Sequence, residues 1–443
     1  MKTTIFRTDY IINTRYLVAF VAMVICTMNT TAQTNIVHSP MVHTLQVMAN
    51  DDWMQTPAVM VLDSEDFVTL SFDYFSHEYH RIACHIIHCN ADWNPSDLNE
   101  NEYLEGFNDR PIDFYEKSLN TTFLYTHYAV DYPNDDARLK VSGNYKVLFY
   151  DEESDVSVLP NQPQYKGCPV IAEGCFRVVE PLVTVSAEVT SNTDIDTHEA
   201  NQQVSFIINH DGYAIDRPES EIKVFVSQND RPDMTATDIR PTYINPGRLE
   251  YTHNRSLIFP GNNEFRRFEV INMHYGSQNV DDISFFDPYF HAVLLPDVDR
   301  RAYSFDADHN GRFLVRYNLA EDQNTEADYL FVHFTLQVPH PLSGGRLYLA
   351  GRFSDYRYTP EYQLTYNLEK SCYEGTALLK MGAYDYQYIF VPDNTTSKLS
   401  MPNPYDGTFY ETENEYTISV YHRPFGERYD HLIAVEAVAF GQE

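Results

Sequence analysis

Hydrophobic and polar positions alternate clearly in two neighbouring stretches of the chain, residues 67–75 and 79–88. In the first stretch one face is apolar, with Val68, Leu70, Phe72 and Tyr74. The other face is polar, with Thr69, Ser71 and Asp73. This pattern predicts a half-exposed β-strand. The second stretch carries apolar or aromatic side chains on both faces and predicts a strand within a core.

Similar short runs recur along the chain and predict further strands. In the first part we expect strands at residues 43–48, 67–75, 79–88, 121–130, 145–150 and 175–179. In the middle part we expect them at residues 204–209, 221–227, 268–271, 291–295 and 312–318. With 34 Tyr and 27 Phe, the composition also favours strands. We therefore predict an all-β protein of tandem immunoglobulin-like β-sandwich domains.

Two polar stretches suggest the domain boundaries. Pro181 and the polar run 191–203 follow the first group of strands, and the acidic run 321–328 precedes the last group. We predict an N-terminal β-sandwich domain at 33–180, a second at 181–324 and a C-terminal immunoglobulin-like domain at 325–443.

The first 32 residues have the layout of a cleaved signal peptide. Lys2, Arg7 and Arg15 precede an apolar segment at 17–28, and small residues end at Ala32. The apolar segment is too short to span a bilayer comfortably. Cys26 lacks the small preceding residue of a lipid-anchor site. We expect an exported, soluble protein without membrane insertion.

The chain is strongly acidic, with 31 Lys and Arg against 64 Asp and Glu. The signal segment holds three of these basic residues and one acid, so the remainder has 28 against 63, a charge of −35. Such a charge disfavours nucleic acid and anionic lipid, and favours solubility or a basic partner. Protection of strand edges by charged side chains is the simpler explanation.

Five cysteines follow the predicted cleavage site: Cys84, Cys89, Cys168, Cys175 and Cys372. Cys84 and Cys89 are five positions apart on an expected strand, so they point to opposite faces and cannot bridge each other. Cys168 and Cys175 flank a short turn and could form a disulfide across a hairpin. Buried free thiols are the default alternative, and the sequence leaves the pairing open.

We predict no catalytic, cofactor-binding or metal-binding residues. His77, His80, His85 and His88, with Glu78 and Cys84, resemble a metal cluster, but strand spacing separates them too far to share an ion. There is no nucleophile elbow, activated thiol or phosphate-binding loop. A small-molecule ligand is not expected.

Two polar segments could be binding sites, but each has a simpler structural explanation. Residues 306–311 resemble the opening of a calcium loop, but Tyr317 stands where the closing Glu belongs. Asn310 and Gly311 instead predict a two-residue hairpin turn. Arg266 and Arg267 could dock an acidic partner, whereas a surface pair bonded to nearby carboxylates is the simpler reading.

The segments GRLYLAGRFSDYRYTPEYQLTYN (345–367) and GTALLKMGAYDYQYIFVPDN (375–394) are similar to immunoglobulin-like modules that bind starch or glycogen. The residues that carry this resemblance are Gly351, Tyr356, Gly382, Tyr384 and Tyr386. It implies that the strand ending near Gly351 pairs with the strand that begins at Gly382. Carbohydrate binding is an alternative function, although this unit lacks tryptophan. Replacing Gly351 or Gly382 by Val is expected to destabilise the unit through lost turn geometry.

A second resemblance covers nearly the whole chain after the signal segment. The runs HIIHCNADW (85–93), EYLEGFNDRPI (102–112) and FLYTHYAVDYPNDDARLKVSGNYKVLFYDEE (123–153) resemble the family of type IX secretion system plug proteins. The resemblance continues through VSQNDRPD (226–233), GNNEFRRFEV (261–270), DHNGRF (308–313) and TENEYTISVYHRPFGERYDHLI (412–433). It implies a non-enzymatic periplasmic protein that seals the inner opening of an outer-membrane translocon barrel, which is the expected partner. The sequence does not identify the docking surface.

Overall fold

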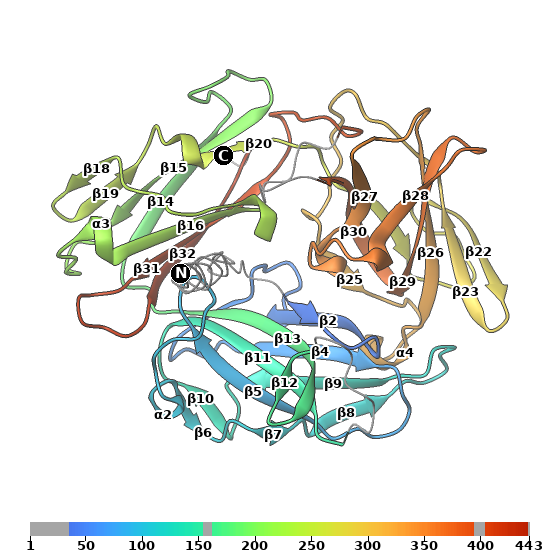
Figure 1. Ribbon diagram of the computed structural model, residues 1–443, viewed down its shortest axis with the longest axis horizontal. Helices are drawn as coiled ribbons and strands as arrows, with labels where there is room; N and C mark the ends of the chain where they lie inside the picture. The colour runs from blue at the N-terminus through green and yellow to red at the C-terminus, as the bar shows by residue number, and fades with distance from the viewer. Residues whose placement is uncertain (1–34, 154–161, 394–403, 442–443) are drawn as a thin grey trace, which may run out of the picture. The chain divides into compact units, whose positions relative to one another are not determined.

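The computed structural model describes residues 35–153, 162–393 and 404–441, and there the protein is all-β, as predicted (Figure 1). Its α-helices in this part of the chain are single turns, α2 (Glu100–Tyr103), α3 (Pro218–Glu221) and α4 (Gln323–Glu326). Four short 3₁₀ turns accompany them, η1 (Pro232–Met234), η2 (Arg255–Leu257), η3 (Arg352–Ser354) and η4 (Pro360–Tyr362). The predicted signal peptide, residues 1–32, lies outside the described residues. None of the described helices is long and apolar enough to cross a membrane.

The first sandwich consists of two sheets that pack over one core. One sheet has the order β2 (Val42–Ala49), β4 (Val68–Tyr74), β9 (Thr126–Tyr132) and β8 (Phe114–Lys117). The other has the order β1 (Ile36–Val37), β13 (Cys168–Val179), β11 (Gly143–Asp151), β5 (Ile82–Cys89) and β7 (Arg110–Pro111). Strands β3 (Val59–Val61) and β12 (Gln164–Tyr165) also pair with β13, and β6 (Leu104–Gly106) pairs with β10 (Ala137–Leu139).

The alternation in β4 places its apolar face in this core. Val68, Leu70 and Phe72 are fully buried, and the Phe72 ring lies 5.0 Å from that of Phe149 on the facing sheet. Burial of several such side chains, at about 1.5–3 kcal/mol each, stabilises the packing of the two sheets. The prediction that residues 67–75 form a strand with an apolar core face is confirmed, but the half-exposed character predicted for it is wrong, because Ser71 and Asp73 on the other face are also buried.

The largest differences from prediction in the first sandwich are the starts of two strands, β9 and β13. Strand β9 begins at Thr126 instead of 121, because the backbone N–H groups of Thr122 and Phe123 are bound by the Asp328 carboxylate. Strand β13 begins at Cys168 instead of 175. The turn predicted between Cys168 and Cys175 is therefore wrong, and their side chains cannot meet across a hairpin. No disulfide joins the cysteines of the described residues.

The second sandwich contains the last two strands of the chain. One sheet holds β14 (Thr184–Thr190), β15 (Asn201–Asn209), β19 (Arg248–Tyr251) and β18 (Tyr243–Asn245), with β20 (Ile258–Pro260) also on β15. The other has the order β17 (Thr235–Ala236), β16 (Ile222–Gln228), β31 (Glu415–His422) and β32 (His431–Ala439). Figure 1 shows the red C-terminal strands beside the green β16.

The third sandwich is one ten-stranded sheet that folds over onto itself. Its order is β21 (Arg266–Val270), β30 (Gly382–Pro392), β27 (Gly345–Ala350), β28 (Gln363–Asn367), β29 (Cys372–Lys380), β26 (Tyr329–Gln337), β23 (Tyr289–Leu294) and β22 (Val280–Phe286). Strand β25 (Phe313–Val315) pairs with β30, and β24 (Asp297–Val298) with β26. Phe268 in β21 lies 5.6 Å from Phe334 in β26, which closes the core.

The predicted boundary between domains at residue 324 is wrong. Strands β21 to β25 precede that boundary but belong to the third sandwich, and β31 and β32 follow it but belong to the second. The hydrophobic pattern locates strands but does not say which sheet each joins. The immunoglobulin-like connection of each sandwich stays a prediction.

The hairpin predicted at Asn310 and Gly311 is only partly correct. Both residues have positive φ, 53° and 83°, and the Arg312 N–H donates to the His309 carbonyl at 3.2 Å, so a turn forms. Strand β25 follows this turn, but it pairs with β30 instead of a strand preceding the turn. By contrast, the predicted pairing of β27 with β30 is confirmed, with Ala350 opposite Gln387.

Candidate functional site

The histidines that resembled a metal cluster are dispersed among separate partners. The His77 ring lies 2.9 Å from the Ser118 hydroxyl and that of His80 3.2 Å from the Ser76 hydroxyl. His85 contacts Asp109 at 3.1 Å, and His88 contacts Ser96 at 2.8 Å. Within the described ranges no three His, Cys, Asp or Glu side chains are arranged to hold a metal ion.

The two adjacent arginines are both bonded to carboxylates. Arg266 is buried, with Nη1 2.7 Å from Asp297 and a further ion pair to Asp406. Arg267 Nη2 lies 3.1 Å from Asp306. Pairing with carboxylates is therefore confirmed, but the surface position predicted for Arg266 is wrong because strand β24 supplies its buried partner.

The tyrosines of the glycan-module resemblance lie in the core of the third sandwich or beside it. Tyr356, Tyr384 and Tyr386 are 6%, 3% and 2% exposed. The Tyr384 ring stacks on Phe268 at 5.2 Å, and the Tyr386 hydroxyl donates to Asp297 at 2.7 Å. Stacking on a sugar requires an open aromatic face, so these side chains do not form a glycan platform.

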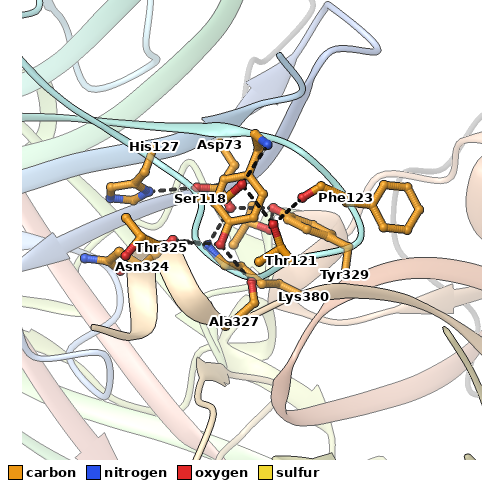
Figure 2. A network of polar contacts seen from close by, with 12 residues as sticks. Asp73, Ser118, Thr121, Phe123, His127, Asn324, Thr325, Ala327, Tyr329 and Lys380 are labelled. Carbon is orange, nitrogen blue, oxygen red and sulfur yellow. Dashed lines mark hydrogen bonds and ion pairs between the residues drawn. The ribbon is translucent and has the colours of Figure 1, made fainter. Parts of the chain in front are cut away.

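A buried ionic network joins the first and third sandwiches (Figure 2). At its centre is Asp73 of β4, which is 1% exposed. One carboxylate oxygen of Asp73 lies 2.6 Å from Lys380 Nζ and accepts a 2.7 Å hydrogen bond from the Tyr329 hydroxyl. The other lies 2.7 Å from His127 Nδ1. Two strands of each sandwich therefore meet at a single carboxylate.

The network extends into the loops beside these strands. Lys380 Nζ also donates to the Asn324 carbonyl at 2.6 Å and lies 4.4 Å from the centre of the Tyr125 ring. The Tyr125 hydroxyl donates to the Ala327 carbonyl at 2.8 Å. The Asp328 carboxylate accepts the N–H groups of residues 122 and 123, as described above. Charge-assisted bonds of this kind are short and directional, so they fix the relative register of the two sandwiches.

Burial and pairing act in opposite directions on the charges of this network. Burial raises the pKa of Asp73, but the positive charge of Lys380 and the hydrogen bond from His127 outweigh it, so the pKa lies below its usual value. Burial lowers the pKa of Lys380 despite the attraction of Asp73. Burial beside Asp73 raises the pKa of Tyr329 well above its usual value, which keeps that hydroxyl protonated as a donor.

The chemistry of the network is structural. Lys380 is 2% exposed and its ammonium is already committed to Asp73, Asn324 and the Tyr125 ring. Sequence reasoning missed the network because alternation assigns Asp73 to a solvent-facing side. The available signal is Lys380 itself, which ends the otherwise uncharged run GTALLK (375–380) in β29. A lysine there needs a buried counter-charge.

An open groove of about 620 Å³ lies over the first sandwich next to this network. His127 and Asn324 belong to both. The groove is lined by five aspartates, Asp51, Asp113, Asp131, Asp135 and Asp136, and by one arginine, Arg110. Its lining also includes Phe107 and Phe114, which are 72% and 52% exposed. The groove is thus acidic, with exposed aromatic rings among its lining residues.

Comparison with known proteins gives a family and a solved structure. A family model described as type 9 secretion system plug protein 1st domain matches residues 42–162. A crystal structure of a hypothetical protein from Parabacteroides merdae is 41% identical, covers 92% of this chain and 100% of its own, and has a TM-score of 0.86. No curated protein matches. The matched residues include the first sandwich from β2 to β11 and every groove residue except Asn324. The chain therefore carries, over residues 42–162, the first domain of the type IX secretion system plug protein family.

Proposed function

We propose that this protein is a non-enzymatic periplasmic plug, which seals the periplasmic opening of the outer-membrane type IX translocon barrel when no cargo passes. The match of residues 42–162 to the first domain of plug proteins carries this proposal. The barrel is the partner, and the protein reaches the periplasm through a cleaved signal peptide. Contact with the barrel holds it at the outer membrane.

The geometry supports a role that depends on rigidity. A plug must present a fixed surface to a rim, because a deformable body would leak or be drawn into the channel. The Asp73 network locks the first sandwich to the third, and Tyr421 of the second sandwich donates a 2.7 Å hydrogen bond to Asn144 of the first. Specific interfaces usually bury on the order of 1,600 Å² of surface. Three joined sandwiches can offer a contact surface of that size, and such a contact can still be released when the channel changes state.

Carbohydrate binding is the weaker alternative, because the tyrosines on which it depends are buried. Affinity purification distinguishes the two functions. The tagged protein, incubated with detergent-solubilised outer membrane, is expected to recover the translocon barrel, identified by mass spectrometry. Retention on immobilised glucan without recovery of the barrel would instead favour the alternative.

Sealing itself is tested by conductance. The purified barrel in a planar lipid bilayer is expected to conduct ions when open, and this protein added to the periplasmic side should close it. Bovine serum albumin at the same concentration, also acidic, serves as the control for nonspecific block. Unchanged conductance with the protein bound to the barrel would contradict a sealing role.

A further inference from the structure

We propose that the groove of the first sandwich, together with the free edge of β8, docks a basic, extended segment of the translocon barrel. This inference rests on the proposed plug function and assigns it a surface. The features that carry it are a strand at the edge of its sheet, exposed aromatic rings, and three groove carboxylates that have no basic partner among the described residues.

Strand β8 is an edge strand, and no other strand of the described residues pairs with its outer side. It stands at the end of the sheet order β2, β4, β9, β8, and its four residues are all exposed. Edge strands are usually protected, because unpaired N–H and C=O groups accept another strand. Phe114 and Ala129 face each other across β8 and β9, so their side chains lie on the same face, and both line the groove. A segment added to β8 would place every second side chain on this face.

The exposed aromatic residues give such a segment an apolar anchor. Phe114 lies on β8 itself and Phe107 in the loop between β6 and β7, and both line the groove. Large aromatic side chains are strongly enriched where protein partners bury them. Two rings more than half exposed beside one groove therefore favour a protein partner over an ordinary solvated surface.

The charge of the groove determines the chemistry of the occupant. Arg110 is already paired with Asp136 and lies 3.6 Å from Asp113. No basic side chain of the described ranges pairs with Asp51, Asp131 or Asp135. The Asp131 carboxylate accepts a hydrogen bond from a neutral donor, the Thr69 hydroxyl, at 2.7 Å. Carboxylates in a groove concentrate their field there, so the complementary segment carries Lys or Arg.

Two sets of substitutions test the groove in the full chain. The first neutralises the charge with D51N, D131N and D135N, and the second removes the rings with F107S and F114S. A matched control, E188Q, E219Q and E369Q, removes three exposed acids from the second and third sandwiches. Each variant is first checked for an unchanged thermal unfolding midpoint, so that lost binding is not lost folding.

The measurement is the amount of translocon barrel that each tagged variant retains from detergent-solubilised outer membrane. We expect each groove variant to retain roughly tenfold less barrel than wild type, and the control variant to match wild type. Raising the salt from about 0.05 M to about 0.5 M should weaken wild-type retention more than that of the charge variant, because screening acts on charges the variant lacks.

The outcomes separate this inference from the function on which it rests. If wild type retains the barrel and the groove variants retain it equally, the groove is not the docking surface and the plug function stands. If wild type retains no barrel, both are overturned. Equal loss in the charge variant and the control variant, with the ring variant retaining as much barrel as wild type, would show that net charge alone mediates binding, which also overturns the groove.

Discussion

Asp73 has the least expected environment of any single residue in this molecule. It lies on the polar face of an alternating strand, yet it is buried between Lys380, His127 and Tyr329. Removing one partner of a buried ion pair leaves an uncompensated charge, which costs far more than the pair itself contributes. Asp73 and Lys380 should therefore behave as one unit in mutational tests.

We expect D73N to lower the free energy of unfolding by about 3–5 kcal/mol, because it leaves the Lys380 ammonium buried without its counter-charge. The double variant D73N/K380M should lose less than the sum of the two single variants. Urea unfolding followed by tyrosine fluorescence measures this. The matched control is K370M, which removes an exposed Lys370–Glu374 pair at 2.7 Å and should leave the midpoint nearly unchanged. If the effect of the double variant equals the sum of the two single effects, Asp73 and Lys380 do not act as one unit.

A second buried acid gives a prediction about pH. Burial raises the pKa of Asp385 to about 7, although its carboxylate accepts the N–H groups of His309 and Gly311. The unfolded chain has its ordinary value of 3.8, so between pH 4 and 7 the unfolded state loses a proton that the folded state keeps. Ionisation of Asp385 therefore lowers the free energy of unfolding as the pH rises through that window.

The variant D385N should remove that loss. One oxygen of Asp385 accepts both backbone N–H groups, and the amide oxygen of Asn can accept the same two. We expect D385N to equal wild type near pH 4 and to be more stable at pH 8, by on the order of 2–4 kcal/mol. Thermal unfolding of both proteins across this range measures the difference. A difference that does not change with pH would contradict the assignment.

Among the elements, the contact of β25 with β30 depends on the absence of a side chain at Gly382. A Cβ built on Gly382 would lie 2.2 Å from the Leu314 carbonyl oxygen. Gly351 is also in close contact with its neighbours, because a Cβ there would lie 2.6 Å from the Asp385 carbonyl oxygen. Its φ is −178°, an extended conformation that any residue can adopt. Both glycines are therefore required because the backbone of a neighbouring segment packs against them, and not because of the turn geometry that we predicted from the sequence.

We expect G382A to destabilise the protein by about 1–3 kcal/mol, because the added methyl group forces β25 away from β30. The matched control is G276A, whose Cβ would meet only the Val280 carbonyl oxygen at an ordinary 3.6 Å. Urea midpoints of the two variants give the comparison. Equal urea midpoints for G382A and G276A would mean that β25 can move away from β30 without loss of stability.

The elements also show how far sequence reasoning reaches. Alternation correctly identified the core face of β4, because period-two hydrophobicity reflects local burial. It failed for Asp73 on the opposite face, because the lysine that covers it is 307 positions away. It also located the segment 121–130 as β-prone but could not detect that Asp328 holds its first residues as a loop. The buried network was therefore beyond local pattern reading, whereas the all-β class was not.

At the scale of the whole molecule, the chain returns to complete a sandwich it began about 200 residues earlier. Strand β31 pairs with β16 on one side and with β32 on the other, and it buries Tyr416, Ile418 and Val420 against the facing sheet. They also contact the first sandwich, where the Glu180 N–H donates to the Leu432 carbonyl at 3.0 Å. The three sandwiches are therefore not independent units in sequence, and the last strands hold two of them together.

Deleting residues 413–443 should consequently abolish folding of the second sandwich. Five fully or almost fully buried side chains would be lost, Tyr416, Ile418, Val420, Leu432 and Ile433. At about 2 kcal/mol each their burial contributes about 10 kcal/mol, which is comparable to the entire stability of a domain. Limited proteolysis should then cut within residues 184–260, which full-length protein protects. Adding a synthetic peptide of residues 413–441 should restore protection, since the missing strands can pair without a covalent link. Protection of 184–260 in the truncated chain without that peptide would mean that the second sandwich is stable alone, and that its last two strands serve only to connect it to the first.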